Sequence, residues 1–206
     1  MAIEPLTPER RRQQTREHLL QAAAQVFAER GFHGASLDEV AAVAGFTKGA
    51  VYSNFKNKED LFLALFKANQ DREIEALQAT LDVSDAPPAS RLADFVALIR
   101  DQTREVGTNF GLLYQEFWLY AARNPAAREQ LMQIEDDAVR SVARIIEGER
   151  GPGVEPLESS LQAARLVEIL FRGIGLLRVL QPDVADDAFI EAALLFVARA
   201  LDAPTD

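Results

Sequence analysis

The chain has 206 residues, of which 48% are apolar and 26% charged, and its formal charge at pH 7 is −10. This composition excludes a disordered, collagen-like or coiled-coil chain, and the absence of cysteine excludes disulfides, thiolate metal sites and a cysteine nucleophile. The acidic total argues against nucleic acid as a partner, but residues 1–60 hold eight basic and eight acidic side chains, so the whole excess of acid lies beyond residue 60.

Apolar residues recur with helical spacing along almost the whole chain, which predicts an all-α protein of about nine helices. Thr7 and Pro8 are expected to start the first helix, and Gly31 to end it in a left-handed conformation. Asn57 can cap a fourth helix that starts at Lys58. Later helices are expected over about 91–106, 108–123, 125–149, 158–180 and 187–202.

Two short helices are predicted between the first and the fourth. Ser36 and Glu39 form a capping box that starts a helix over 37–44, and a glycine-containing turn separates it from a helix over 48–55. Two short helices joined in this way are typical of a helix-turn-helix, here at about 37–56, whose second helix enters the major groove of DNA.

The outward residues of the second short helix are mostly hydrogen-bond donors, and Gly49 allows its backbone to approach DNA closely. Ser36 and Lys58 lie at helix N-termini, where backbone N–H groups and the helix dipole favour a phosphate. The alternative is that these residues are ordinary helix caps and a solvated lysine. The candidate DNA contacts are Ser36, Thr47, Lys48, Gly49, Tyr52, Ser53, Asn54 and Lys58.

Residues 36–62 read Ser-Leu-Asp-Glu-Val-Ala-Ala-Val-Ala-Gly-Phe-Thr-Lys-Gly-Ala-Val-Tyr-Ser-Asn-Phe-Lys-Asn-Lys-Glu-Asp-Leu-Phe. This stretch resembles the N-terminal DNA-binding domain of the TetR family of bacterial transcriptional repressors. The first helix is similar as well, with Phe27, Gly31 and Phe32 spaced as the family places them. The resemblance is close over about 15–65 and extends to the rest through chain length and helix count.

The resemblance implies a role for each matching residue. Residues 47–49 would open the recognition helix in the major groove, Tyr52 would hydrogen-bond a phosphate, and Lys58 would pair with another. Ser36 would anchor the DNA backbone on the other side of the motif.

The chain departs from the family pattern at Ser53 and Asn54, where many members have a second aromatic residue and a histidine. Arg10 to Arg12 form a basic triplet that is either an arm reaching neighbouring DNA or simply solvated.

The resemblance also implies an organisation and a function. A DNA-binding domain would cover 1–60, and a ligand-binding and dimerisation domain 61–206. The protein would repress transcription by binding a near-palindromic operator as a homodimer, and a small-molecule inducer would release it by shifting the fourth helix. The uneven charge fits this division, because residues 1–60, which carry no net charge, would meet double-stranded DNA. The acidic remainder of the chain would be repelled by the DNA.

An aromatic stripe marks the helix expected over 108–123, where four aromatic residues follow helical spacing. Such a stripe is usually core, but part of it could line a cavity, because ligand sites are mainly apolar with a few placed polar groups. Two polar residues fall on the apolar face of the preceding helix. The candidate contacts to a partly apolar or aromatic inducer are Gln102, Thr103, Phe110, Tyr114, Phe117 and Trp118.

The last two helices have more apolar surface than a small domain can cover. The final helix is apolar almost all round, and its predecessor combines an apolar face with two glycines. A dimer interface explains this pattern, and a larger core within the chain is the alternative. The expected interface residues are Ile169, Gly173, Ile174, Leu177, Leu194 and Val197.

No pattern favours an enzyme, a metal site or a cofactor, because His18 and His33 do not form a metal-binding pair and no strand precedes Gly173 and Gly175. A protein-interaction module without DNA binding would leave the outward donors without a purpose. The apolar runs are too short to cross a membrane, and residues 1–14 lack the apolar stretch of a secretory signal. We therefore expect a cytoplasmic protein without enzymatic activity or membrane contact.

Overall fold

A computed structural model describes residues 7–82, 107–147 and 158–202. Every element in these ranges is an α-helix, which confirms the all-α prediction, and the helix expected over 91–106 lies outside them together with Gln102 and Thr103. No helix of the described ranges is both long and apolar enough to cross a membrane. The helices are α1 (Pro8–Gly34), α2 (Leu37–Ala44), α3 (Lys48–Asn54), α4 (Lys58–Asp82), α6 (Gly107–Arg123), α7 (Pro125–Glu147), α8 (Glu158–Leu180) and α9 (Asp187–Asp202).

The ends of α1 follow the sequence signals closely. The Thr7 hydroxyl accepts a hydrogen bond from the backbone N–H of Arg10 at 3.3 Å, which caps the helix. Gly31 has φ 69° and ψ 173°, so the regular helix breaks there, in a left-handed conformation that glycine adopts without strain. Residues 10–12 lie inside α1, so the basic triplet belongs to a helix and does not form a separate arm.

The two short helices are held by the predicted caps. The Ser36 hydroxyl accepts from the N–H of Glu39 at 3.2 Å, and the Glu39 carboxylate accepts from the N–H of Ser36 at 3.1 Å, so the capping box is complete. Thr47 caps α3 by accepting from the N–H of Ala50 at 3.2 Å. Local sequence therefore places the turn that separates α2 from α3.

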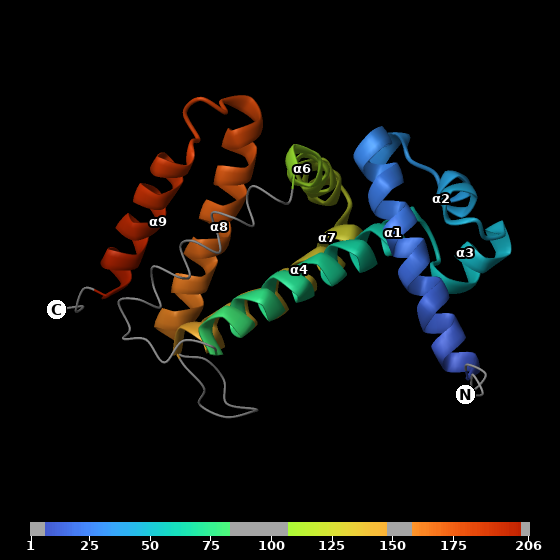
Figure 1. The fold of residues 1–206 in the computed structure, drawn as a ribbon, viewed down its shortest axis with the longest axis horizontal. Coiled ribbons are helices and arrows are strands. Elements are labelled where there is room, and N and C mark those ends of the chain that lie inside the picture. Colours follow the sequence, from blue (N-terminus) through green and yellow to red (C-terminus); the bar gives the residue numbers. More distant parts are fainter. Residues whose placement is uncertain (1–6, 83–106, 148–157, 203–206) are drawn as a thin grey trace, which may run out of the picture.

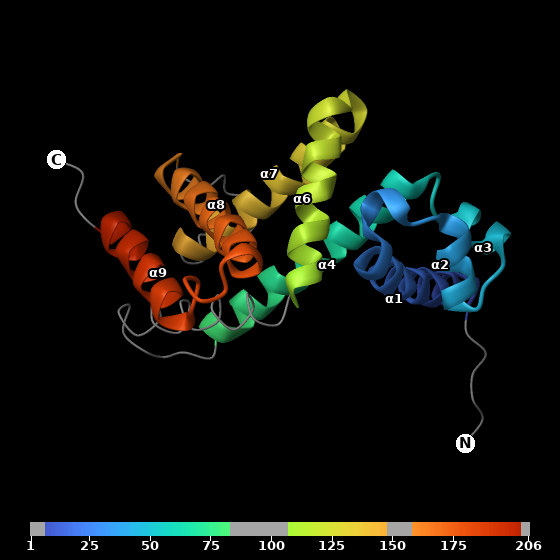
Figure 2. The ribbon, with the colours of Figure 1, turned by 90° about the horizontal axis from the view of Figure 1, so that it is seen from above.

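The molecule is elongated, with a head and a body (Figure 1). The head consists of α1, α2 and α3, and the body of α4 and the later helices. The fourth helix runs from the head to the α8 end of the body, and α8 and α9 lie side by side at that end (Figures 1 and 2). The sixth helix stands between the two regions and packs on α1, α7 and α8.

One hydrophobic core joins the head to the body. It runs from α1, α2 and α3 through the first part of α4 to α6 and the start of α7. Phe117 of α6 is fully buried at its centre, with its ring centroid 4.2 Å from that of Phe62 and 4.9 Å from that of Phe32. Each such buried aromatic contributes about 1.5–3 kcal/mol through the hydrophobic effect alone. The expected division at residue 60 therefore crosses a continuous core.

Candidate DNA-binding surface and buried polar cluster

The first helix supports the recognition helix α3 from behind. Phe55, directly after α3, is buried, and the Arg16 guanidinium lies 4.4 Å from its ring centroid. Arg16 also donates to the carbonyl of Asn54 at 3.2 Å, and Arg12 to that of Ser53 at 3.5 Å. Cations at the C-terminal carbonyls of a helix complement its dipole. These contacts fix the direction in which the other end of α3 points.

The N-terminal end of α3 is exposed to solvent. Thr47, Lys48 and Gly49 are exposed, and the Tyr52 side chain is 56% exposed although it is a large aromatic group. An exposed, rigidly supported tyrosine beside hydrogen-bond donors is suited to a phosphate and the edges of bases. The structure thus brings these four predicted residues onto one surface.

Lys48 forms an ion pair across the helix-turn-helix. Its Nζ lies 2.5 Å from Oδ2 of Asp38 on α2, and both side chains are more than half exposed. The hydrogen bond and the charge of Asp38 raise the pKa of Lys48, so the lysine stays charged at neutral pH. A phosphate that binds Lys48 has to compete with this carboxylate.

Ser53 and Asn54 bond to their own helix. The Ser53 hydroxyl donates to the carbonyl of Ala50 at 2.9 Å, and the Asn54 amide donates to the same carbonyl at 2.8 Å. Asn54 is also half-buried. These bonds use one donor of each side chain and leave the Ser53 hydroxyl oxygen and the Asn54 amide oxygen as acceptors, so base contacts from the two residues remain a prediction.

Ser36 and Lys58 both stabilise the turn between α1 and α2. The hydroxyl of Ser36 belongs to the capping box, and Nζ of Lys58 donates to the carbonyls of His33 and Ala35, each at 3.0 Å. The Lys58 ammonium also lies 4.9 Å from the ring centroid of Phe32. The structural role considered for these residues is therefore present, and a phosphate contact from either one remains a prediction.

The aromatic stripe of α6 divides into two parts. Phe117 and Tyr114 are both buried in the core that joins head and body, whereas Trp118 is 36% exposed. The backbone of Phe110 lies in α6, but its side chain lies outside the described residues. The stripe is therefore partly core, the usual role of such a pattern, and a ligand cavity lined by part of it remains a prediction.

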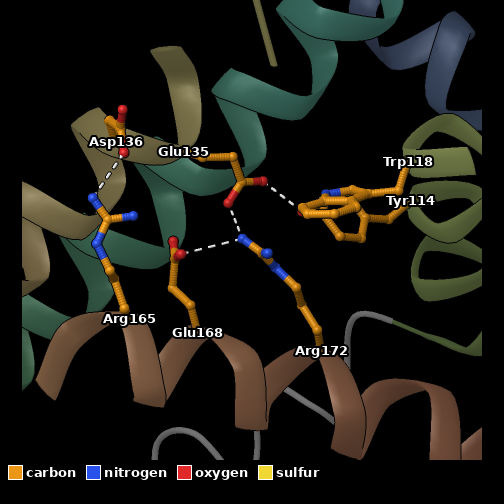
Figure 3. Close-up of polar contacts among 7 residues, drawn as sticks. All are labelled: Tyr114, Trp118, Glu135, Asp136, Arg165, Glu168 and Arg172. Atoms are coloured by element: carbon orange, nitrogen blue, oxygen red, sulfur yellow. Dashed lines mark hydrogen bonds and ion pairs between the residues drawn. The ribbon is translucent and has the colours of Figure 1, made fainter. Parts of the chain in front are cut away.

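Tyr114 and Trp118 belong to a polar cluster that joins three helices (Figure 3). The Tyr114 hydroxyl donates to Glu135 of α7 at 2.5 Å and accepts from Nε1 of Trp118. Arg172 of α8 forms ion pairs with Glu135 and, at 3.1 Å, with Glu168. Its guanidinium carbon also lies 5.3 Å from the ring centroids of both Tyr114 and Trp118. We call these five residues the Arg172 cluster.

Burial shapes the electrostatics of the Arg172 cluster. Burial raises the pKa of Glu168 to about 7, and the positive charge of Arg165 offsets part of this rise. Burial also lowers the pKa of Arg172. Burial also raises the pKa of Tyr114, which therefore stays protonated. Arg165 itself pairs with Asp136 at 3.2 Å on the exposed side of the cluster.

Three members of this cluster were not among the predicted site residues: Glu135, Glu168 and Arg172. Glu135 follows the buried Leu131 by four residues, so it falls on the buried face of α7. Glu168 and Arg172 continue a charged stripe that begins at Arg165 in the sequence. An acidic residue at an apolar helix position was the signal that could have located the cluster.

A second polar connection fixes α6 to the head. The Glu116 carboxylate accepts the backbone N–H of Phe32 at 2.7 Å, and the Tyr120 hydroxyl donates to Glu59 at 2.7 Å. The positive φ of Gly31 favours glycine, and a Cβ atom there would lie 2.8 Å from Glu116 Oε2, so a side chain at this position would displace the Glu116 carboxylate. The sequence signal at Gly31 gave the conformation but not the partner.

The expected dimer residues of α8 do not all face outward. Ile169 is 61% exposed and Gly173 is exposed, whereas Leu177 is half-buried. Ile174 is only 5% exposed because it packs on Ile190 of α9, so we correct its assignment to an interface. Two further expected residues, Leu194 and Val197, lie in α9, but their side chains lie outside the described residues.

Comparisons with known proteins agree with this geometry. Residues 19–65 match the model of a family described as bacterial regulatory proteins, tetR family. The chain is also 30% identical over 138 residues to the HTH-type transcriptional repressor DhaR of Mycobacterium sp. (strain GP1), which covers 65% of this chain and 67% of DhaR. The chain belongs to the TetR family. It is therefore similar to transcriptional regulators, and α2 and α3 lie within the residues that match the family model.

Other TetR-family matches differ in extent. The HTH-type transcriptional regulator AcrR of Shigella flexneri is 41% identical over 58 residues, which are 28% of this chain and 27% of AcrR. Several curated relatives are likewise matched over about a third of their length or less. The crystal structure of the transcriptional regulator FadR from Bacillus subtilis, in complex with stearoyl-CoA, superposes with a TM-score of 0.63 at 22% identity, over 92% of this chain and 99% of FadR. That likeness shows that the fold extends over the body.

Proposed function

We propose that this TetR-family chain is a transcriptional repressor that binds a near-palindromic operator as a homodimer and is released by a small molecule. The observation that carries the DNA-binding part is the exposed N-terminal end of α3, held in place by the contacts of Arg12 and Arg16 to its other end. Two such helices in a dimer would read half-sites about 34 Å apart, or a multiple of that distance. Such a protein would act in the cytoplasm, where bacterial DNA lies.

The exposed apolar surface of α8 supports the dimer. Leu166 and Ile169 point to solvent on one face of the helix, and Leu180, Val184 and Phe189 are exposed around the turn to α9. Large apolar side chains exposed along one helix and its following turn are suited to an interface. A second copy of the chain would cover it with the same surface, as a twofold axis requires.

The position of α6 supports release by a small molecule. This helix contacts the head through Glu116 and Tyr120 and the rest of the body through Tyr114. A ligand that binds one arrangement of α4 and α6 more tightly than another would change the spacing of the two heads, since only differential affinity shifts such an equilibrium. The complex of FadR with stearoyl-CoA supports the binding of a small molecule by a protein of this fold.

Loss of DNA binding in two variants of the recognition surface tests the proposal. An operator is first selected with the full-length protein from a pool of random duplexes, and affinity is then measured by fluorescence anisotropy. We expect Lys48→Ala and Tyr52→Ala each to weaken binding by about tenfold, because each removes a contact worth about 1–3 kcal/mol. Lys48→Ala should also reduce the salt dependence of binding.

The matched control is Lys67→Ala. Lys67 lies on α4, is about half exposed and pairs with Asp71 at 2.9 Å, as Lys48 pairs with Asp38. The control variant should bind the operator as the parent does. Equal affinity of all three variants would show that the end of α3 does not contact DNA.

A further inference from the structure

The Arg172 cluster contains more negative than positive groups. One guanidinium faces two carboxylates, since Arg172 pairs with both Glu135 and Glu168. The ion pair between Arg165 and Asp136 is internally neutral and lies on the exposed side of the cluster. If both carboxylates are ionised, the buried part of the cluster carries a net negative charge, and burial of that charge is what makes Glu168 hold its proton.

The cluster also has the geometry of a cation site. The Arg172 guanidinium carbon lies 5.3 Å from the ring centroids of both Tyr114 and Trp118, within the range of cation–π attraction. Carboxylates and aromatic faces together are the groups that recognise an ammonium or guanidinium ion. The chain thus supplies its own cation, from α8, to a site built from α6 and α7.

Arg172 can leave this site more easily than its partners can. Its side chain is 22% exposed, whereas the side chain of Glu135 is almost fully buried. Tyr114 is held in place by its hydrogen bond to Glu135 and by stacking on Phe66, at 4.8 Å between ring centroids. The Glu135 carboxylate and the tyrosine ring are therefore held in place, and the guanidinium is the more solvent-accessible group.

We propose that the Arg172 cluster is the recognition site for a cationic effector, a molecule with an ammonium or related group on an apolar or aromatic body, which takes the place of the Arg172 guanidinium. This inference rests on the proposed function and names the chemical class of the small molecule. An anionic effector on Arg172 would have to displace two carboxylates and remain beside them, which is electrostatically unfavourable. A cation can instead pair with Glu135 and Glu168 as the Arg172 guanidinium does.

Trp118 provides a direct measurement of binding. It is the single tryptophan of the chain, so the intrinsic fluorescence of the whole protein reports on this cluster. The probes are 2-phenylethylammonium, 2-phenylethanol and 3-phenylpropionate, which share a phenyl ring and differ in charge. We expect the cation to change the emission saturably and to bind at least tenfold more tightly than the other two. Tightest binding of the anion, or equal binding of all three, would overturn the proposal.

Two variants separate recognition from structure. Glu168→Gln should weaken binding of the cation at least fivefold, whereas Asp71→Asn, which removes an exposed carboxylate on α4, should leave it unchanged. Arg172→Gln removes the internal competitor and should tighten binding of the cation. Loss of cation binding in Arg172→Gln with native circular dichroism, or unchanged affinity in Glu168→Gln, would overturn the proposal.

The fluorescence titration needs no DNA, so it separates this inference from the proposed function. Tight binding of the cation without any change in operator affinity would support the site and contradict release by its ligand. Release of the operator by the anionic probe, with no response of Trp118 to the cation, would contradict the cationic effector and leave a ligand-responsive repressor intact.

Discussion

The head and the body expose opposite kinds of side chain at the places that meet a partner. On the head, the exposed end of α3 is polar and its apolar residues are buried against α1. On the body, α8 turns Leu166 and Ile169 to solvent and directs Glu168 and Arg172 toward α6 and α7. In the head, α3 packs with its apolar residues inward, whereas in the body α8 leaves apolar residues exposed, at the surface where we propose that the dimer forms.

The largest expected effect is on the hydrophobic core that joins the head to the body. Phe117→Ala should lower the free energy of unfolding by about 3–5 kcal/mol, because it leaves a cavity between Phe32 and Phe62. Urea unfolding followed by circular dichroism measures this loss. Leu119→Ala, on the exposed side of the same helix, should have almost no effect. A small loss for Phe117→Ala would mean that head and body are packed independently.

The head was largely predictable because its signals are local. The Ser36–Glu39 capping box, the positive φ of Gly31 and the exposed donors at the start of α3 depend on residues at most a few positions apart. Each helix start predicted from a cap agrees with the structure, because a cap satisfies backbone N–H groups of its own first turn.

The body was less predictable because its important contacts join distant residues. Glu135 and Arg172 are separated by 37 positions, and Glu116 and Phe32 by 84, so no local spacing indicates either pair. Ile174 shares a helix face with residues that proved exposed, yet the position of α9 covers it. Periodicity predicts a helix and its faces, but which face meets which neighbour is a property of the tertiary fold.

The outward apolar face of α8 gives the next largest expected effect. Ile169→Asp should weaken the proposed homodimer by about hundredfold, since it places a charge in a desolvated interface. Sedimentation velocity at several concentrations measures the shift. The matched control is Leu119→Asp on α6, because Leu119 is 62% exposed and Ile169 is 61% exposed. A chain that remains dimeric with Ile169→Asp, or is monomeric without it, would contradict an interface on this face.

Two adjacent acidic residues of α7 test whether the Arg172 cluster is buried, and the expected effect on stability is smaller. Glu135→Gln should lower the free energy of unfolding by about 1–3 kcal/mol, because it leaves the buried Arg172 and Tyr114 with a weaker partner. Asp136→Asn, one position along, removes only an exposed pair with Arg165 and should cost less than about 1 kcal/mol. Similar losses for both variants would show that the Arg172 cluster is solvated.

The smallest expected effect is a pH dependence of stability that arises in the body. Burial raises the pKa of Glu168 and Glu73 to about 7 in the folded protein, above the ordinary 4.5. Folding therefore favours their protonated forms, and this contribution to stability is complete below about pH 4.5 and is lost as the pH rises through 7.

Glu168→Gln should remove part of this slope, since Glu73 keeps the rest. The charged groups that face Glu168 are Arg165 and Arg172 of its own helix and Asp136 and Glu135 of α7. Chemical unfolding of the parent and the variant at pH 5, 6, 7 and 8 measures the difference between their slopes. The variant should lose less stability between pH 5 and pH 8 than the parent, because glutamine has no proton to release as the pH rises. Identical slopes would mean that Glu168 stays ionised throughout this range, held by the guanidinium of Arg172.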